Sequence, residues 1–134
     1  MLKIETKEAI LDKNNQTVFE FASNIENFEK LLPADKVEGF SASNNACSFT
    51  IKGISKIGFK ISETIINEKI VFQSEGKNPF DFKIVLNISE NGANQSKIKI
   101  NFEGNANPFI AMMAEKPLTN FFNMLIDKAI LHFN

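Results

Sequence analysis

The sequence predicts one soluble α+β domain in which a curved antiparallel sheet surrounds a long C-terminal helix. Two observations support this fold class. Between Ala46 and Phe102, five segments alternate apolar and polar residues, as strands solvated on one face do. Between Pro108 and Phe133, apolar residues recur with helical spacing and are numerous enough to require cover on most sides. With 134 residues and no linker or repeat, we expect a single domain, residues 1–134.

The N-terminal third of the chain predicts one strand followed by two short helices. Residues 2–11 alternate in polarity and are expected to form a single strand. Asn14 or Asn15 can cap the helix that follows, because asparagine side chains accept hydrogen bonds from free backbone N–H groups. A second short helix is expected over residues 27–32, and Pro33 ends it.

The five alternating segments predict a meander. Short turns rich in Gly, Asn and Pro separate them, so consecutive strands are antiparallel neighbours. One face of this sheet is apolar and is expected to point inward. Its residues are Cys47, Phe49 and Ile51; Ile57, Phe59, Ile61 and Ile65; Ile70 and Phe72; Phe80, Phe82, Ile84, Leu86 and Ile88; and Ile98, Ile100 and Phe102.

The final helix is expected to begin at Asn107, as its cap, and Pro108, as its first residue. An apolar stripe runs from Leu118 to Phe133 and predicts the buried side of this helix. Pro117 is expected to kink the helix, because proline lacks the N–H that an interior helical position donates.

Composition excludes several classes of function. All fifteen basic residues are lysines and the net charge is -1, so we expect no nucleic acid partner. Cys47 is the only cysteine, so no disulfide within the chain is expected. The sequence has no cluster of Cys and His residues, so we expect no metal and no other cofactor. The chain shows no signal peptide and no continuous apolar run of about 20 residues, which predicts a cytoplasmic protein without a membrane span.

Several short motifs resemble one known superfamily. The segment Gln16-Thr17-Val18-Phe19-Glu20-Phe21 leads into Asn27-Phe28-Glu29-Lys30-Leu31-Leu32-Pro33, and Glu115-Lys116-Pro117-Leu118 follows in the last helix. These motifs, together with the order of elements, resemble bacterial members of the SRPBCC superfamily, also called START-like or Bet v 1-like. The resemblance covers essentially the whole chain and implies the helix-grip fold.

The resemblance also implies a cavity between the sheet and the last helix. Such cavities hold lipids, sterols, polyketides or other apolar molecules, so an apolar small molecule or lipid is the expected partner. The oligomeric state stays open between a monomer and a homodimer. A filled core would show the same apolar pattern. The residues expected to line the cavity are Phe49, Ile51, Phe59, Ile61, Glu63, Phe72, Phe82, Ile84, Ile100, Phe109, Met112, Met113 and Met124.

Glu63 is the polar residue that best fits an inward position, because it continues the phase of Phe59 and Ile61. The alternative is that a bulge or the rim of the sheet turns it outward. His132 and Cys47 have no visible catalytic partner. A hydrophobic-ligand binding module is therefore the main hypothesis, and the alternatives are a polyketide cyclase or aromatase-like enzyme that uses Glu63 and a protein–protein interaction module.

Overall fold

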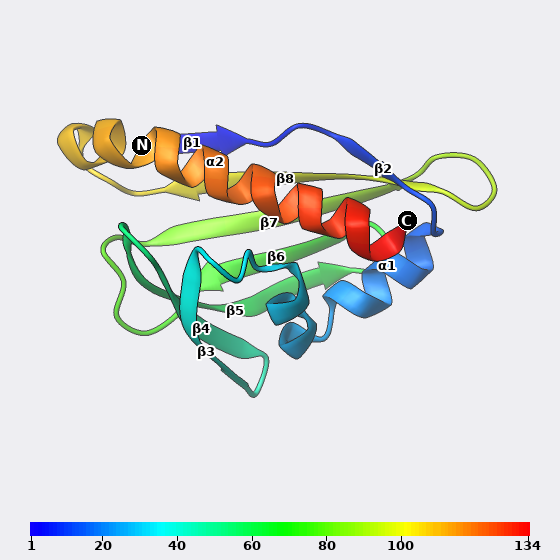
Figure 1. Cartoon of the computed structure of the whole chain (residues 1–134), viewed down its shortest axis with the longest axis horizontal. Coiled ribbons are helices and arrows are strands. Elements are labelled where there is room, and N and C mark those ends of the chain that lie inside the picture. Colours follow the sequence, from blue (N-terminus) through cyan, green and yellow to red (C-terminus); the bar gives the residue numbers. More distant parts are fainter.

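The computed structural model describes all residues, 1–134, as one antiparallel sheet with a long helix lying across it (Figure 1). The sheet has the strand order β1-β8-β7-β6-β5-β4-β3, and β2 also pairs with β8. This arrangement confirms the predicted α+β helix-grip architecture. The elements are β1 (Leu2–Glu5), β2 (Ala9–Leu11), α1 (Asn15–Ala22), the 3-10 helix η1 (Ile25–Leu31), β3 (Val37–Ser43), β4 (Ala46–Ile51), β5 (Ser55–Ile65), β6 (Lys69–Ser74), β7 (Phe82–Glu90), β8 (Ser96–Gly104) and α2 (Pro108–Phe133).

The meander has six strands, one more than the sequence predicts. The additional strand is β3, which pairs with β4 across a turn at Asn44 and Asn45, where φ is 51° and 64°. Asparagine tolerates such left-handed conformations better than most residues. The register of β3 shifts between Glu38 and Ser41. Its side chains are half-buried or exposed, so the apolar alternation that marks the other strands is missing.

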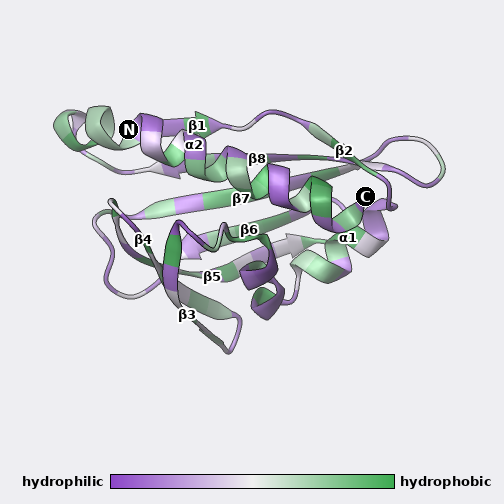
Figure 2. Cartoon of the chain, viewed as in Figure 1, coloured by the Kyte–Doolittle hydropathy of each residue, from purple (hydrophilic) through white to green (hydrophobic).

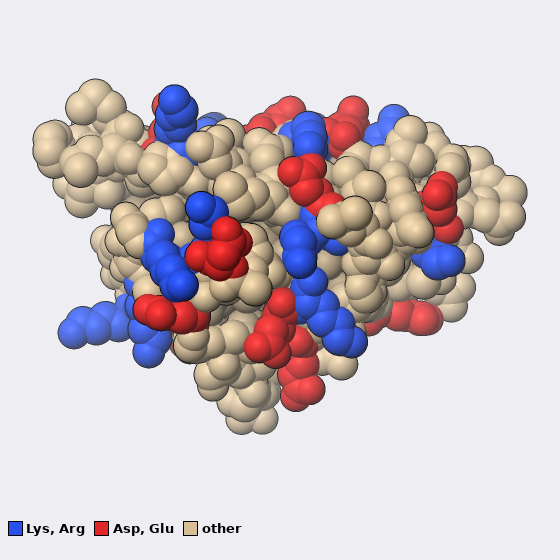
Figure 3. Space-filling model, viewed as in Figure 1, with Lys and Arg blue, Asp and Glu red and all other residues tan.

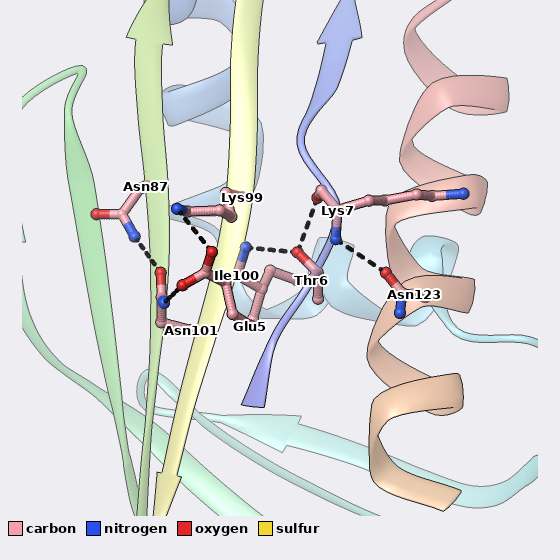
Figure 4. A network of polar contacts seen from close by, with 8 residues as sticks. All are labelled: Glu5, Thr6, Lys7, Asn87, Lys99, Ile100, Asn101 and Asn123. Carbon is pink, nitrogen blue, oxygen red and sulfur yellow. Dashed lines mark hydrogen bonds and ion pairs between the residues drawn. The ribbon is translucent and has the colours of Figure 1, made fainter. Parts of the chain in front are cut away.

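The single strand predicted over residues 2–11 is divided into β1 and β2, which both pair with β8. Thr6 lies between them and is almost fully buried. Its Oγ1 accepts a hydrogen bond from the Ile100 N–H at 2.9 Å and donates one to the Lys7 carbonyl at 3.0 Å (Figure 4). The Lys7 N–H donates to Asn123 Oδ1 at 3.1 Å. The segment between β1 and β2 is thus hydrogen-bonded to α2.

Asparagine side chains begin both short helices. Asn14 Oδ1 accepts from the Thr17 N–H at 2.9 Å at the start of α1, as predicted. Asn24 Oδ1 accepts from the Glu26 N–H at 3.2 Å at the start of η1. The predicted second helix therefore exists, but it begins at Ile25 and has 3-10 geometry.

The last helix, α2, runs from Pro108 to Phe133 and continues through Pro117. Asn107 caps it, with Oδ1 accepting from the Ile110 N–H at 2.9 Å. The kink expected at Pro117 remains a prediction. The first turns of α2 project past the sheet, whereas its second half lies over the sheet (Figure 1). No helix has the combination of length and apolarity that crossing a membrane would need.

Phenylalanine side chains dominate the core between the sheet and α2. Figure 2 shows hydrophobic residues along α2 and in alternation with hydrophilic ones along β7. The ring centroids of Phe28 and Phe59 are 5.3 Å apart, those of Phe59 and Phe72 are 5.5 Å apart, and those of Phe102 and Phe122 are 5.2 Å apart. These rings meet edge-on or tilted, which is the packing that aromatic quadrupoles favour.

Candidate functional site

An apolar cavity lies between the sheet and the second half of α2, and α1 and η1 close it on a third side. Its volume is about 50 Å³, and all 14 residues that line it are hydrophobic. The two short helices contribute Val18, Phe21, Ala22, Phe28 and Leu31; the sheet contributes Phe72, Ile84, Leu86, Ile98 and Ile100; and α2 contributes Leu125, Ile126, Ala129 and Phe133.

The cavity is small because phenylalanine rings occupy the rest of the space under α2. Pockets that hold drug-sized ligands have volumes of about 300–1,000 Å³. A volume of about 50 Å³ has room for only a few water molecules. Phe49, Phe59, Phe82 and Phe121 fill the interior toward the first half of the helix, and all four are buried. The hollow remains where α2 runs over Ile98 and Ile100.

The cavity is least tightly covered on the side formed by α1 and η1. Phe21, Ala22, Phe28 and Leu31 all line the cavity and are only half-buried. Aromatic contacts hold α1 to the end of α2, since the Phe21 ring lies 4.5 Å from the His132 ring and 5.1 Å from the Phe133 ring. A short helix and a 3-10 segment thus separate the cavity from solvent.

Three of the predicted lining residues, Phe72, Ile84 and Ile100, do line this cavity. Another four predicted residues are buried in the filled part of the core, and Ile61 is half-buried beside them. These four are Phe49, Ile51, Phe59 and Phe82. The alternation of the sequence identified their inward direction correctly, but neighbouring rings occupy the space they face.

Glu63 does not line the cavity. The register of β5 shifts between Ile61, which pairs with Phe72, and Glu63, which pairs with Val71. This bulge reverses the phase of the strand, so the Glu63 side chain is 61% exposed and lies 3.9 Å from Lys69 Nζ. Ile65 follows the reversed phase and is exposed as well. The carboxyl group proposed for cavity chemistry therefore lies at the surface.

The predicted lining residues of α2 also lie away from the cavity. Phe109, Met112 and Met113 are 66%, 71% and 63% exposed, because the first turns of α2 extend past the sheet. Met124 is half-buried and lines a separate surface hollow with Asn120. The first half of the helix therefore does not enclose a ligand cavity.

Most of the residues that line the cavity are not among the predicted lining residues. Val18, Phe21, Ala22 and Phe28 have the spacing of an apolar helix face, which signals burial of α1 and η1. That spacing carries no information about the partner surface. The cavity lies here because the two short helices cross the open end of the sheet, an arrangement that only the tertiary fold creates.

The remaining candidate groups have structural roles. Cys47 is buried, and burial raises the pKa of its thiol to about 12, so it stays protonated near neutral pH. His132 is exposed and packs against Phe21. Ser96 is fully buried on the face of β8 that carries Ile98, and its Oγ has no hydrogen-bond partner. It is the only fully buried side-chain polar atom that lacks such a partner.

No protein-family model and no curated protein matches the sequence. Solved structures do match in fold. Protein XoxI from Bacillus cereus superposes with a TM-score of 0.78 over 99% of this chain and 96% of that chain, at 8% identity. A START superfamily protein from Mycobacterium smegmatis gives 0.70 over 98% and 99%, at 11% identity. A norcoclaurine synthase mutant from Thalictrum flavum, bound to a transition-state analogue, gives 0.78 over 98% and 92%, at 13% identity.

These superpositions cover nearly the whole chain and include its long C-terminal helix. The class of protein that they define is an α+β helix-grip domain. More specifically, the chain has the START-like, or Bet v 1-like, fold that the sequence motifs predicted. At 8–13% identity the three matches establish the fold only.

Proposed function

We propose that the protein binds an apolar small molecule or a lipid chain in the cavity between the sheet, α2 and the two short helices. The observation that carries this proposal is the wall of the cavity, in which all 14 residues are hydrophobic. A ligand held there is bound by burial of apolar surface, at about 2.5 kcal/mol for each 100 Å² removed from water. Nothing in the wall selects for charge, so the ligand group inside is uncharged.

Binding requires the cavity to widen, since about 50 Å³ is too small for such a ligand. The short helices α1 and η1 are the elements we propose to move. Four of their five cavity-facing side chains are half-buried, and 3-10 hydrogen bonds have poorer geometry than α-helical ones. Rotation of Phe28 away from Phe72 and of Phe21 away from Phe133 would extend the hollow toward solvent. The ligand would take the place of these rings.

The cyclase or aromatase alternative depended on Glu63 as its acid or base. Because the bulge in β5 places this carboxyl group at the surface, beside Lys69, it cannot reach a molecule in the cavity. No carboxylate or histidine lines the cavity. The structure thus favours the binding module over the alternative that relied on this residue.

Filling the cavity tests the proposal. Ala22 lines the hollow and is half-buried, so Ala22→Leu adds volume inside without burying a polar group. Titration with the uncharged fluorophore N-phenyl-1-naphthylamine should show saturable binding to the wild type and at least tenfold weaker binding to this variant. Ala34→Leu, at an exposed position, is the matched control and should bind as the wild type does. Equal binding by both variants would place the probe elsewhere.

The natural ligand can be identified directly. Native mass spectrometry of protein purified gently from its own source should reveal an apolar adduct of one molecule per chain, and solvent extraction should release it for identification. A polar or charged adduct would contradict the proposed ligand class, because the wall offers such a group no hydrogen-bond partner.

A further inference from the structure

A cluster of large apolar side chains stands exposed on the first turns of α2. Phe109, Met112 and Met113, which we call the α2 tip, are each more than 60% exposed. Their spacing of i, i+3 and i+4 places them on one side of the helix. The half-buried Ala111 and Ala114 pack against the core and hold the tip outward. In Figure 3 the projecting end of α2 carries no charged residue, and the first charged residues lie further along the molecule.

Lysines lie behind the tip on the same side of the helix. At 100° per residue, Lys116 lies between the directions of Phe109 and Met112, one turn further along α2. Glu115, the nearest acid on the helix, points about 120° away from Phe109, about 100° away from Lys116 and about 60° away from Met112, so it lies beside the exposed apolar side chains rather than among them. A surface hollow of about 210 Å³ lies beside α2 at Pro117 and Asn120. Lys36 and Lys52 line this hollow, and no carboxylate does.

The shape and the charge of this end of the molecule fit a lipid bilayer. Apolar side chains that project from a helix can enter the boundary between head groups and acyl chains, while lysines behind them meet anionic head groups. The tip is convex and uncharged, and Lys36, Lys52 and Lys116 supply the cations. A bilayer is broad enough to contact the tip and these lysines together.

We propose that the α2 tip docks the protein on the surface of anionic membranes, with Phe109, Met112 and Met113 inserted and the three lysines against the head groups. Docking of this kind is peripheral and reversible, since only a few side chains enter the bilayer. The proposal is independent of the cavity, which lies under the opposite half of α2. Its failure and the failure of the proposed ligand binding are therefore separable.

Vesicle flotation tests the proposal with the full chain. The wild type should float with vesicles of phosphatidylcholine and phosphatidylserine in a 3:1 ratio and much less with phosphatidylcholine alone. The triple variant Phe109→Ser, Met112→Ser, Met113→Ser changes exposed residues only and should lose flotation while keeping its circular dichroism spectrum. Leu131→Ser, at an exposed apolar residue near the other end of α2, is the matched control and should float normally.

Neutralising the lysines should weaken vesicle binding by roughly fivefold for each residue, the equivalent of about 1 kcal/mol per lysine near an anionic surface. Lys52→Gln and Lys116→Gln measure this effect, with Lys13→Gln, an exposed lysine just before α1, as the control. Ala22→Leu, which fills the cavity, should float normally. This last variant separates membrane docking from ligand binding.

Three results would overturn the proposal. The first is a wild type that floats with neither type of vesicle, and the second is a triple variant that floats as well as the wild type. The third is sedimentation velocity that shows a dimer in the wild type and a monomer in the triple variant. That outcome would mean that a second copy of the chain, rather than a membrane, covers the α2 tip.

Discussion

Gly58 is a position where the fold leaves no room for a side chain. Its N–H donates to Asn78 Oδ1 at 2.9 Å, and its carbonyl accepts from Asn78 Nδ2 at 3.1 Å and from the Glu75 N–H at 3.0 Å. A Cβ atom at this residue would lie 2.9 Å from the Glu75 carbonyl oxygen. The loop after β6 is thereby held against β5 by the Asn78 side chain and the Glu75 backbone.

We expect Gly58→Ala to lower the free energy of unfolding by about 1–3 kcal/mol, because the Glu75 backbone must move and loosen these hydrogen bonds. Urea denaturation measures the change. Ser48→Ala, on the neighbouring strand, is the control and should change stability by less than about 0.5 kcal/mol. An unchanged midpoint for Gly58→Ala would show that the loop yields freely.

The Cys47 thiol provides a second residue-scale prediction. Burial raises its pKa from 9.0 to about 12, so at pH 9 about half of an unfolded thiol is ionised but only about one part in a thousand of the folded one. Iodoacetamide should therefore label Cys47 in native protein at least a hundredfold more slowly than in urea. Rapid labelling of the native protein would contradict the burial of this side chain.

The same shift predicts how stability depends on pH. Below pH 9 both states keep the thiol proton, and the contribution of Cys47 to stability is fully present. As the pH rises from 9 toward 12, the unfolded state loses this proton and the folded state retains it, so the free energy of unfolding falls. Cys47→Ala should show a shallower alkaline decline in urea denaturation. Parallel declines would mean that other groups account for the whole slope.

At the scale of elements, α2 has two halves with opposite surroundings. Phe122 is 1% exposed, with its ring 5.2 Å from that of Phe102 and 5.6 Å from that of Phe121. Met112, ten residues earlier on the same helix, is 71% exposed. A long apolar sequence thus continues from the surface into the core.

We expect Phe122→Ala to lower the free energy of unfolding by about 3–5 kcal/mol, because it leaves a cavity among close-packed rings. Met112→Ala removes a side chain of comparable length from the same helix and should change stability by less than about 0.5 kcal/mol. Chemical denaturation of the two variants makes the comparison. A large loss for Met112→Ala would mean that the first turns of α2 are buried in solution.

Strands β4 to β8 could be predicted because their side chains alternate between the core and solvent. β3 could not, since it lies at the edge of the sheet and buries few side chains. The bulge in β5 could be named from the sequence only as an alternative, because one extra residue reverses the phase of a strand without changing its composition. The structure has this alternative, in which Glu63 points outward.

At the scale of the whole molecule, the paired strands should be far more stable than the cover of the cavity. Backbone pairing joins β7 and β8 over nine residue pairs, and both strands are flanked by further strands, whereas η1 is a single 3-10 segment beside a hollow. Hydrogen exchange should therefore be slowest in β7 and β8 and much faster in α1 and η1.

Binding of N-phenyl-1-naphthylamine should slow exchange in α1 and η1 and leave β3 unchanged, because the proposed ligand lies under the two short helices. Wild-type protein with and without the probe provides the comparison. Protection spread evenly over the sheet, or confined to the first turns of α2, would contradict the proposed position of the ligand.

The fold class, the order of most elements and most of the inward faces of the strands follow from the amino-acid pattern, because burial imposes a period of two on strands and 3.6 on helices. Where space remains among the buried side chains depends on the packing of the folded chain. Fourteen phenylalanines can fill a core or line a cavity with the same pattern, and the outcome depends on how their rings pack. Here the rings fill the space under the first part of the buried stripe of α2, and the hollow remains beneath α1 and η1.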